Sequence, residues 1–215
     1  MTRLHRFDGR FPEWGSTMRR TLAGRVVLVT GASRGFGADL AADLARAGVR
    51  LALTARSHGA LNAVAARLKG DGAEVEPFPA DLADPAARIA LVAAVAARFG
   101  TLDGLVNAAS AGCHTTLADS TPELVRAAAE VNFFAPVELI RLAHPQLLKS
   151  ATAGRRPVVV NVVRSGGGAA VAGGRQALVG LTQAARIEFA RYDIAVTWVP
   201  EQSGPASVVG SLMSG

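Results

Sequence analysis

The sequence predicts an α/β fold, a doubly wound, mostly parallel sheet of at least six strands with helices on both faces. Short apolar runs alternate with longer helical stretches from residue 25 to residue 199 without interruption. This alternation is the signature of right-handed βαβ units, in which a crossover helix makes consecutive strands parallel. The chain has 215 residues, enough for one such domain and too few for two ordinary ones.

The first predicted strand, residues 26–29, is a continuous apolar run. A run of this kind is typical of a strand whose two faces are both buried, as in a parallel sheet covered by helices. Similar short runs predict five more strands, at residues 49–54, 74–78, 102–106, 157–163 and 194–199.

Longer stretches between these strands predict helices. Gly48, Gly70 and Gly100 follow the first three of them, and glycine is the residue that most often ends a helix. The helices are expected at residues 38–47, 58–69, 85–99, 122–148 and 171–191.

The two ends of the chain differ from the central part. Residues 1–22 show no periodicity and are predicted to be an N-terminal extension. Residues 201–215 are rich in Ser and Gly and are predicted to be a flexible tail. The domain itself is therefore expected over residues 23–200.

Composition excludes several classes of protein. Half of the residues are hydrophobic and 19% are charged, which supports a packed core and excludes disorder over most of the chain. No apolar run is long enough to cross a membrane, and the N-terminal residues contain no signal-peptide core, so no membrane partner is expected. Cys113 is the single cysteine, which excludes a disulfide framework and fits a reducing, cytoplasmic compartment.

Charge gives no sign of a nucleic-acid partner. The net charge is +6, and Lys69 and Lys149 are the only lysines. The arginines are scattered along the chain, no basic run carries interleaved aromatic residues, and no nucleic-acid motif is present. No metal-ligand spacing is present either, so no metal is expected.

A glycine-rich loop connects the first predicted strand to the first predicted helix. Gly31 allows a tight turn, Gly35 removes a side chain where a pyrophosphate must approach, and Gly37 lets the helix pack closely on the sheet. A phosphate would then meet free backbone N–H groups at the helix N-terminus. The position of the loop, after a buried strand and before a helix, predicts a dinucleotide site.

Over about residues 22–200, the sequence resembles the short-chain dehydrogenase/reductase family. The resemblance implies a Rossmann-like fold, an oxidoreductase function and a small-molecule substrate. It lies in residues 30–37, Asp81-Leu82, residues 105–109 and Val131-Asn132. In the family these are, in order, the phosphate loop, the adenine contact, the loop that stabilises the central sheet and the helix Asn that holds a proton-relay water. With the residues at the end of the second strand, the resemblance implies twelve cofactor-binding residues: Gly31, Ser33, Arg34, Gly35, Phe36, Gly37, Arg56, Ser57, Asp81, Leu82, Asn107 and Ala108.

The end of the second strand favours NADP over NAD. An NAD site needs an acid there to accept the ribose 2′-OH, and residues 53–57 contain none. Arg56 stands at the right place to bind a 2′-phosphate, next to Ser57, and Arg34 in the glycine loop can reach the same phosphate. Asp81 would accept a hydrogen bond from the adenine amino group.

The catalytic half of the family pattern is missing. The family uses a Tyr, a Lys four residues later and a Ser, and acid catalysis of this kind contributes about 10²–10⁴ in rate. Aligning residues 178–182 with the family places Val171 at the Tyr position and Arg175 at the Lys position. The Ser position falls on Arg164, next to Ser165. Tyr192, the single tyrosine, lies at the far end of its helix and is expected to be structural.

The family's Pro-Gly after the sixth strand is also changed. The corresponding pair here is Pro200-Glu201, and the chain ends at Gly215. The substrate-covering helices and seventh strand usual in the family therefore have little room, so a fold truncated at the C-terminus is expected. Asn132 is retained, but the Tyr and Lys whose proton relay it supports in the family are absent.

Three functions stay open. In the first, the chain is a pseudoenzyme that has lost Tyr-dependent carbonyl reduction and serves as a cofactor sensor or an inactive partner. Alternatively, it is an NADPH-dependent reductase whose acid is His114, Ser165 or water, with Asn132 in the relay. The third possibility is a cyclase or isomerase in which Arg164 and Arg175 hold an acidic or enolate substrate.

The family commonly forms dimers through two helices. Here these are residues 122–148 and residues 171–191, and the first carries apolar residues enough for both core and interface. A homodimer is therefore expected.

Overall fold

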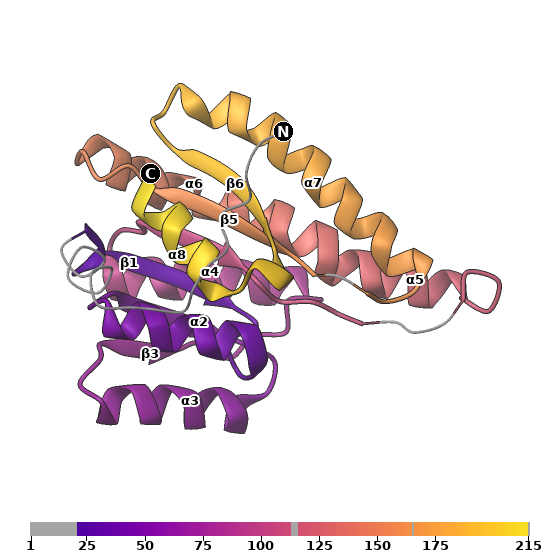
Figure 1. Cartoon of the computed structure of the whole chain (residues 1–215), viewed down its shortest axis with the longest axis horizontal. Helices are drawn as coiled ribbons and strands as arrows, with labels where there is room; N and C mark the ends of the chain where they lie inside the picture. Colours follow the sequence, from indigo (N-terminus) through magenta and orange to yellow (C-terminus); the bar gives the residue numbers. More distant parts are fainter. Residues whose placement is uncertain (1–20, 113–115, 165, 215) are drawn as a thin grey trace, which may run out of the picture.

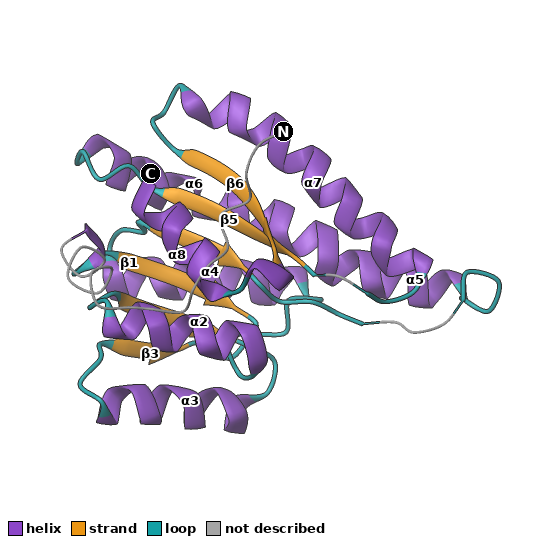
Figure 2. Ribbon diagram, in the orientation of Figure 1, coloured by secondary structure: helices purple, strands orange, loops and turns teal. Residues whose placement is uncertain are grey.

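The computed structural model describes residues 21–112, 116–164 and 166–214. Over these residues the chain forms one sheet of six parallel strands in the order β3-β2-β1-β4-β5-β6 (Figures 1 and 2). This order, with a reversal of direction between β1 and β4, is that of a doubly wound Rossmann-like fold, so the predicted fold class is confirmed. The strands are β1 (Val26–Thr30), β2 (Arg50–Thr54), β3 (Val75–Pro77), β4 (Gly104–Asn107), β5 (Val158–Val163) and β6 (Ala195–Pro200).

Local sequence signals set the ends of several helices. At the start of α4 the side chain of Asp84 accepts a hydrogen bond from the amide of Ala86, and Gly100 ends the helix in the left-handed conformation. Thr121 caps α5 in the same way through the amide of Leu124. The helices are α2 (Gly35–Arg46), α3 (His58–Gly70), α4 (Pro85–Phe99), α5 (Pro122–Ala129), α6 (Ala135–Thr152), α7 (Ala169–Ala190) and α8 (Pro205–Ser214).

The sheet is buried between two layers of helices, as Figure 2 shows. Apolar side chains of α2, α3 and α8 pack on one face of the sheet. Side chains of α4, α6 and α7 pack on the other face. Both cores are built mainly from Ala, Val and Leu, as the low aromatic content predicts.

The C-terminal segment differs from the predicted flexible tail. Residues Glu201–Ser203 form the 3-10 turn η2, and α8 continues to Ser214. Val208, Val209 and Leu212 of α8 are buried, because the spacing of these residues places them on one helix face against the core. The prediction of a flexible tail used only the Ser and Gly content of the segment. Composition does not show the spacing of the apolar residues, and that spacing creates the buried face.

The N-terminal extension predicted over residues 1–22 lies, up to residue 20, outside the described residues. Leu22 is fully buried in the core with α2 and β1. The packed domain therefore begins at least one residue earlier than predicted.

The long helix predicted at residues 122–148 is divided by a π-helical turn. This turn, η1 (Glu130–Phe134), separates α5 from α6 and contains the buried Asn132. A π turn inside a helix bends it and often marks a functional site.

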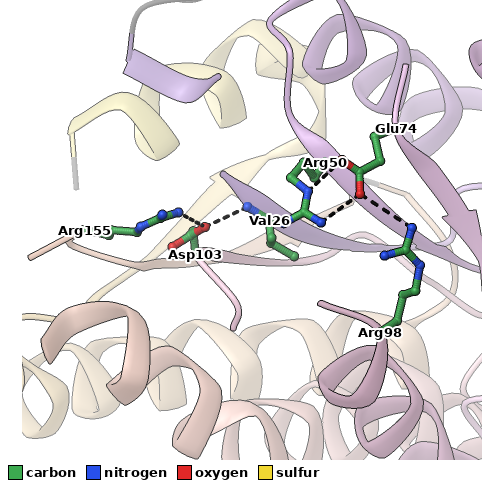
Figure 3. Close-up of polar contacts among 6 residues, drawn as sticks. All are labelled: Val26, Arg50, Glu74, Arg98, Asp103 and Arg155. Carbon is green, nitrogen blue, oxygen red and sulfur yellow. Dashed lines mark hydrogen bonds and ion pairs between the residues drawn. The ribbon is translucent and has the colours of Figure 1, made fainter. Parts of the chain in front are cut away.

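Charged side chains hold together the amino ends of the strands. Figure 3 shows Asp103, just before β4, which accepts hydrogen bonds from the amide of Val26 at 2.7 Å and from Arg155 at 3.3 Å. In the same view Arg50 at the start of β2 binds the carboxylate of Glu74 through two hydrogen bonds, and Arg98 approaches the same carboxylate at 3.5 Å. This edge of the sheet lies opposite the carboxyl ends, where ligands bind in such folds, so these contacts stabilise the fold.

We expect Glu74→Gln to lower the free energy of unfolding near neutral pH by no more than about 1 kcal/mol, because the ion pair between Arg50 and Glu74 is largely exposed to solvent. The hydrogen bond from Arg50 holds the pKa of Glu74 below its ordinary value of 4.5. The stabilisation is therefore present above pH 4.5 and is lost as the pH falls through the lower, folded-state pKa. Urea unfolding of Glu74→Gln and of the unsubstituted protein, repeated across the acid range, measures this loss of stability.

Glu188→Gln is the matched control, since Glu188 is exposed on α7 and forms no ion pair among the described residues. A difference between Glu74→Gln and the unsubstituted protein that stays constant into the acid range would contradict the assignment.

Candidate functional site

A cleft of about 490 Å³ lies at the carboxyl ends of the strands, where the order of the sheet reverses between β1 and β4. Open α/β sheets bind their ligands at this position. Eight of the twelve predicted cofactor residues line the cleft: Gly31, Ser33, Arg34, Arg56, Ser57, Asp81, Leu82 and Ala108.

Two contacts bring the loops after β1 and β4 together. The hydroxyl of Thr30 at the end of β1 accepts hydrogen bonds from the amides of Ala108 at 2.9 Å and Ala109 at 3.0 Å. Gly31 follows with a φ of +68°, and a Cβ there would lie 2.8 Å from the Cα of Ala109. This position therefore requires glycine both for its backbone conformation and for the close approach of the two loops.

The start of α2 leaves backbone N–H groups without a side-chain cap. Arg34 at the cap position is extended, and its side chain makes no capping hydrogen bond. A Cβ on Gly37 would lie 2.8 Å from the carbonyl carbon of Gly31, so the glycine lets the helix begin against the loop. The uncapped N-terminus of a 12-residue helix beside a cleft suits an anion.

The residues that line the cleft include charges of both signs. Arg34 and Arg56 are exposed and line the cleft, whereas residues 55–57 contribute no acid. Asp81, from the loop after β3, lines it too, and one of its carboxylate oxygens accepts a hydrogen bond from the amide of Ala83 at 3.0 Å. Two arginines, which can bind a phosphate, and a carboxylate, which can accept a hydrogen bond from an amino group, thus line the same cleft.

Four of the predicted cofactor residues do not line the cleft. Gly35 and Gly37 lie at the start of α2, and Phe36 packs against the core. Asn107 is buried, and its amide donates to Asn161 at 2.8 Å, which in turn donates to Thr182 at 2.8 Å. Asn107 thus joins β4 to β5 and α7.

Asn132 holds the loop that follows β4. Its side-chain oxygen accepts hydrogen bonds from the hydroxyl of Ser110 at 2.9 Å and the amide of Ala111 at 3.2 Å. Its amide nitrogen donates to the carbonyl of Ala111 at 2.9 Å. Ser110 and Ala111 both line the cleft, so Asn132 positions part of the cleft wall from within the π turn.

The other predicted catalytic residues, His114 and Ser165, lie outside the described residues, as does Cys113. Asn132 is therefore the one predicted catalytic side chain whose position the described part of the chain gives.

Near β5 and β6 the cleft is lined by Arg164, and two further charged residues, Glu201 and Arg175, lie close to it. Arg164 follows β5 and lines the cleft, and its Nε lies 2.9 Å from a carboxylate oxygen of Glu201, which follows β6. Arg175 in α7 donates a hydrogen bond to the carbonyl of Gly166. Burial and, to a lesser degree, the charge of Arg164 lower the pKa of Arg175, whereas Glu201 opposes the shift.

Val171, at the position aligned with the family's Tyr, is fully buried. The ion pair between Arg164 and Glu201 was not predicted, since these residues are far apart in the sequence and no local pattern connects them. The parallel pairing of β5 with β6 places Val163 beside Pro200, and so brings the two next residues together.

Tyr192 lies at the other end of α7, next to the amino end of β6. Its ring packs against His144 of α6, with the ring centres 5.2 Å apart, and His144 also packs against Phe189. These contacts fit the structural role that the sequence predicts for Tyr192 and separate it from the cleft.

A second hollow, of about 570 Å³, lies between the C-terminal ends of α2 and α3. It is slightly larger than the cleft, but it lies toward the amino ends of the strands, and Asp43 and Arg46 in its wall pair with each other. The switch point and the converging polar groups make the first cleft the candidate site.

The described residues contain neither a group of candidate metal ligands nor a membrane-spanning helix. Within residues 21–112, 116–164 and 166–214, no three His, Cys, Asp or Glu side chains gather as metal ligands would. No helix in the described part of the chain has the length and hydropathy needed to cross a membrane.

Comparison with known proteins places these features in a family. The sequence model of the family described as short chain dehydrogenase matches residues 25–201. Among solved structures, the chain is similar to a metagenomic short-chain oxidoreductase in complex with NADP, with 33% identity and a TM-score of 0.83, over 91% of this chain and 92% of that one.

Two curated relatives are each 34% identical to the chain. One is the protein of Streptomyces violaceoruber named as ketoacyl reductase 1 of the granaticin polyketide synthase, matched over 83% of this chain and 67% of its own length. The other is dehydrogenase/reductase SDR family member 7B of Mus musculus, matched over 60% of this chain and 41% of its own length. The chain thus spans about two thirds and two fifths of these relatives.

The family match takes in every strand described above and the helices α2 to α7. The sheet order, the glycine loop at the switch point and the similarity to a solved family member agree with it. The chain belongs to the short-chain dehydrogenase family.

Proposed function

We propose that the chain binds NADP(H) in the cleft and acts as a cofactor-binding accessory or sensor protein that does not carry out Tyr-dependent carbonyl reduction. One observation carries the proposal. The cleft presents Arg34 and Arg56 at its phosphate end, while the buried Val171 and the charged Arg175 stand where the family has Tyr and Lys.

The residues of the phosphate end fit the cofactor. The uncapped N-terminus of α2 would hold the pyrophosphate, and Arg56 with Arg34 would hold the 2′-phosphate by charge-assisted hydrogen bonds. Asp81 would accept a hydrogen bond from the adenine amino group. The similarity to a short-chain oxidoreductase solved in complex with NADP supports this choice of dinucleotide.

The opposite end of the cleft does not fit carbonyl reduction of the ordinary kind. When bound, NADPH supplies a hydride, and the oxygen that it creates needs a proton. Val171 has no proton to give, and an arginine is a poor proton donor because its guanidinium group is a very weak acid. Asn132, which would serve a proton relay, instead uses its side chain to hold Ser110 and Ala111.

A titration with NADPH and NADH, followed by cofactor fluorescence, tests the proposal together with a panel of carbonyl compounds. NADPH binding without NADPH consumption is expected. Consumption that disappears in His114→Ala or Ser165→Ala would replace the proposal with an atypical reductase. Product formation without cofactor would replace it with a cyclase or isomerase, the second candidate, which Arg164 in the cleft wall favours because it could hold an acidic or enolate substrate.

Arg56→Ala is expected to weaken NADPH binding roughly tenfold or more, because one charge-assisted contact to a phosphate is lost. NADH lacks the 2′-phosphate, so its affinity should stay unchanged. Arg67→Ala is the control, since Arg67 is exposed on the next helix and does not line the cleft. Equal losses for both dinucleotides would contradict the role of Arg56.

We also propose a homodimer formed through α5–α6 and α7. Leu124 is 43% exposed, Phe134 49% and Ile187 81%, so these helices present large apolar side chains to solvent. Light scattering of the purified chain tests this directly. A reducing, cytoplasmic compartment stays our prediction, on the single Cys113.

A further inference from the structure

Arg164, which lines the cleft, has two charged neighbours, and each of the three side chains is placed by a different element. Arg164 directly follows β5, Glu201 directly follows β6, and Arg175 lies in the second turn of α7. The ion pair of 2.9 Å between Arg164 and Glu201 joins the ends of two neighbouring strands. Arg175 is held toward the same strand ends by its hydrogen bond to Gly166, two residues after Arg164.

The positive charge of this cluster is not fully balanced. Among the described residues that form it, two guanidinium groups share one carboxylate, which leaves a net charge of +1. Arg175 feels the charge of Arg164 and is partly removed from water, and both effects make its charged form less stable. An anion bound between the two arginines would offset their repulsion by its opposite charge.

Arg164 has donors left for such an anion. Its contact with Glu201 uses Nε, and its Nη groups have no acceptor among the residues that the structure describes. The side chain lines the cleft and is 45% exposed, so an incoming group can reach it. A guanidinium presents its N–H donors as a planar fork, which matches the two oxygens of a carboxylate.

We propose that Arg164 and Arg175 form a binding site for the carboxylate group of a small-molecule ligand. A carboxylate carries one negative charge and neutralises the cluster, whereas a phosphate dianion would leave an excess of negative charge beside Glu201. Glu201 lies beside the same guanidinium group, so its negative charge lowers the affinity of the site for an anion.

This carboxylate belongs to a ligand other than the dinucleotide. The groups expected to hold the nucleotide phosphates, Arg34 and Arg56, line the other end of the cleft. If NADP(H) binds as the proposed function states, the carboxylate ligand would lie next to the nicotinamide. The binding of the carboxylate does not depend on the proposed function, so carboxylate binding and cofactor binding are tested separately.

Benzoate and benzamide are suitable probes, because they have nearly the same shape and differ in charge. Each is titrated calorimetrically into the protein with and without saturating NADPH, and inorganic phosphate is titrated in parallel. Benzoate is expected to bind at least tenfold more tightly than benzamide and more tightly than phosphate. If NADPH does not bind while benzoate does, the proposed function fails and the carboxylate site stands.

Substitutions of Arg164 and Glu201 are expected to change benzoate affinity in opposite directions. Arg164→Gln is expected to weaken benzoate binding roughly tenfold, because a charge-assisted contact is lost. Glu201→Gln is expected to tighten it severalfold, because the neighbouring acceptor loses its charge. Arg186→Gln, which removes an exposed arginine from the same helix as Arg175, is the control and should leave the affinity unchanged.

A purely structural ion pair between Arg164 and Glu201 would give equal, small losses of stability in both variants and no change in benzoate affinity. That result would overturn the proposal, as would equal affinity for benzoate and benzamide. Tighter binding of phosphate than of benzoate would overturn the assignment to a carboxylate.

Discussion

Replacing Arg88 with methionine is expected to lower the free energy of unfolding by about 3–5 kcal/mol. Arg88 lies in α4 and is only 2% exposed. Its Nη1 donates hydrogen bonds to the carbonyl of Leu82 at 2.9 Å and to Glu130 at 2.7 Å. Its Nε lies 2.7 Å from a carboxylate oxygen of Glu138.

The cost arises mainly from the two carboxylates that the substitution leaves behind. Glu130 and Glu138 are half-buried on η1 and α6, and without Arg88 they repel each other in a poorly solvated site. Methionine keeps the apolar stem and removes only the charge, so the loss reflects electrostatics more than packing.

Urea unfolding measures the change, with Arg98→Met as the control. Arg98 is in the same helix, but its side chain is 45% exposed, so its loss should cost no more than about 1 kcal/mol. Adding Glu130→Gln and Glu138→Gln to Arg88→Met should restore part of the lost stability. A triple variant no more stable than Arg88→Met would show that packing, and not the unpaired charges, causes the loss.

Arg88 also connects the fold to the site. Leu82 lines the cleft, and Glu130 begins the π turn that contains Asn132. The ion pairs of the buried Arg88 therefore fix the side of the cleft that Leu82 lines relative to the helix that positions Ser110 and Ala111.

The strands and the glycine loop could be predicted because their signals are local. A run such as residues 26–29 can be buried on both faces only in a covered sheet, and the structure has β1 at Val26–Thr30. The parallel arrangement then follows from the alternation with helices. Residues placed after different strands, such as Ser33, Arg56 and Asp81, meet in one cleft because parallel strands share a carboxyl edge.

Features that depend on distant partners could not be predicted. In the sequence, Arg88 has the pattern of a helix-surface charge, because its partners Glu130 and Glu138 are contributed by another part of the chain. The hydrogen bond from Asn107 to Asn161 likewise joins residues that are far apart in the sequence, and no local pattern connects them. The composition of residues 201–215 concealed the apolar face of α8, since spacing and not content creates that face.

Gly31→Ala is expected to lower the free energy of unfolding by about 2–5 kcal/mol, with two contributions. A left-handed backbone costs a residue that has a Cβ roughly 1–2 kcal/mol, and Gly31 has a φ of +68°. The new Cβ would also lie 2.8 Å from the Cα and 2.9 Å from the amide nitrogen of Ala109. These are backbone atoms held by Thr30, so the overlap adds about 1–3 kcal/mol.

Gly35→Ala separates the two contributions. Gly35 has a φ of +52°, close to that of Gly31, but a Cβ there meets no atom within 4 Å. It should therefore carry the backbone cost alone, and urea unfolding of the two variants measures the overlap as their difference. Equal losses of stability would mean that the loops after β1 and β4 move apart at little cost.

The same pair of variants also distinguishes fold from binding. The open space at Gly35 is where the pyrophosphate is expected to approach the start of α2, so a methyl group there should weaken NADPH binding while the protein stays folded. Fluorescence titration of Gly35→Ala, under conditions where circular dichroism shows the native fold, measures that loss. Unchanged NADPH affinity in the folded variant would place the phosphates away from this helix, and so remove the physical basis for a dinucleotide in the cleft.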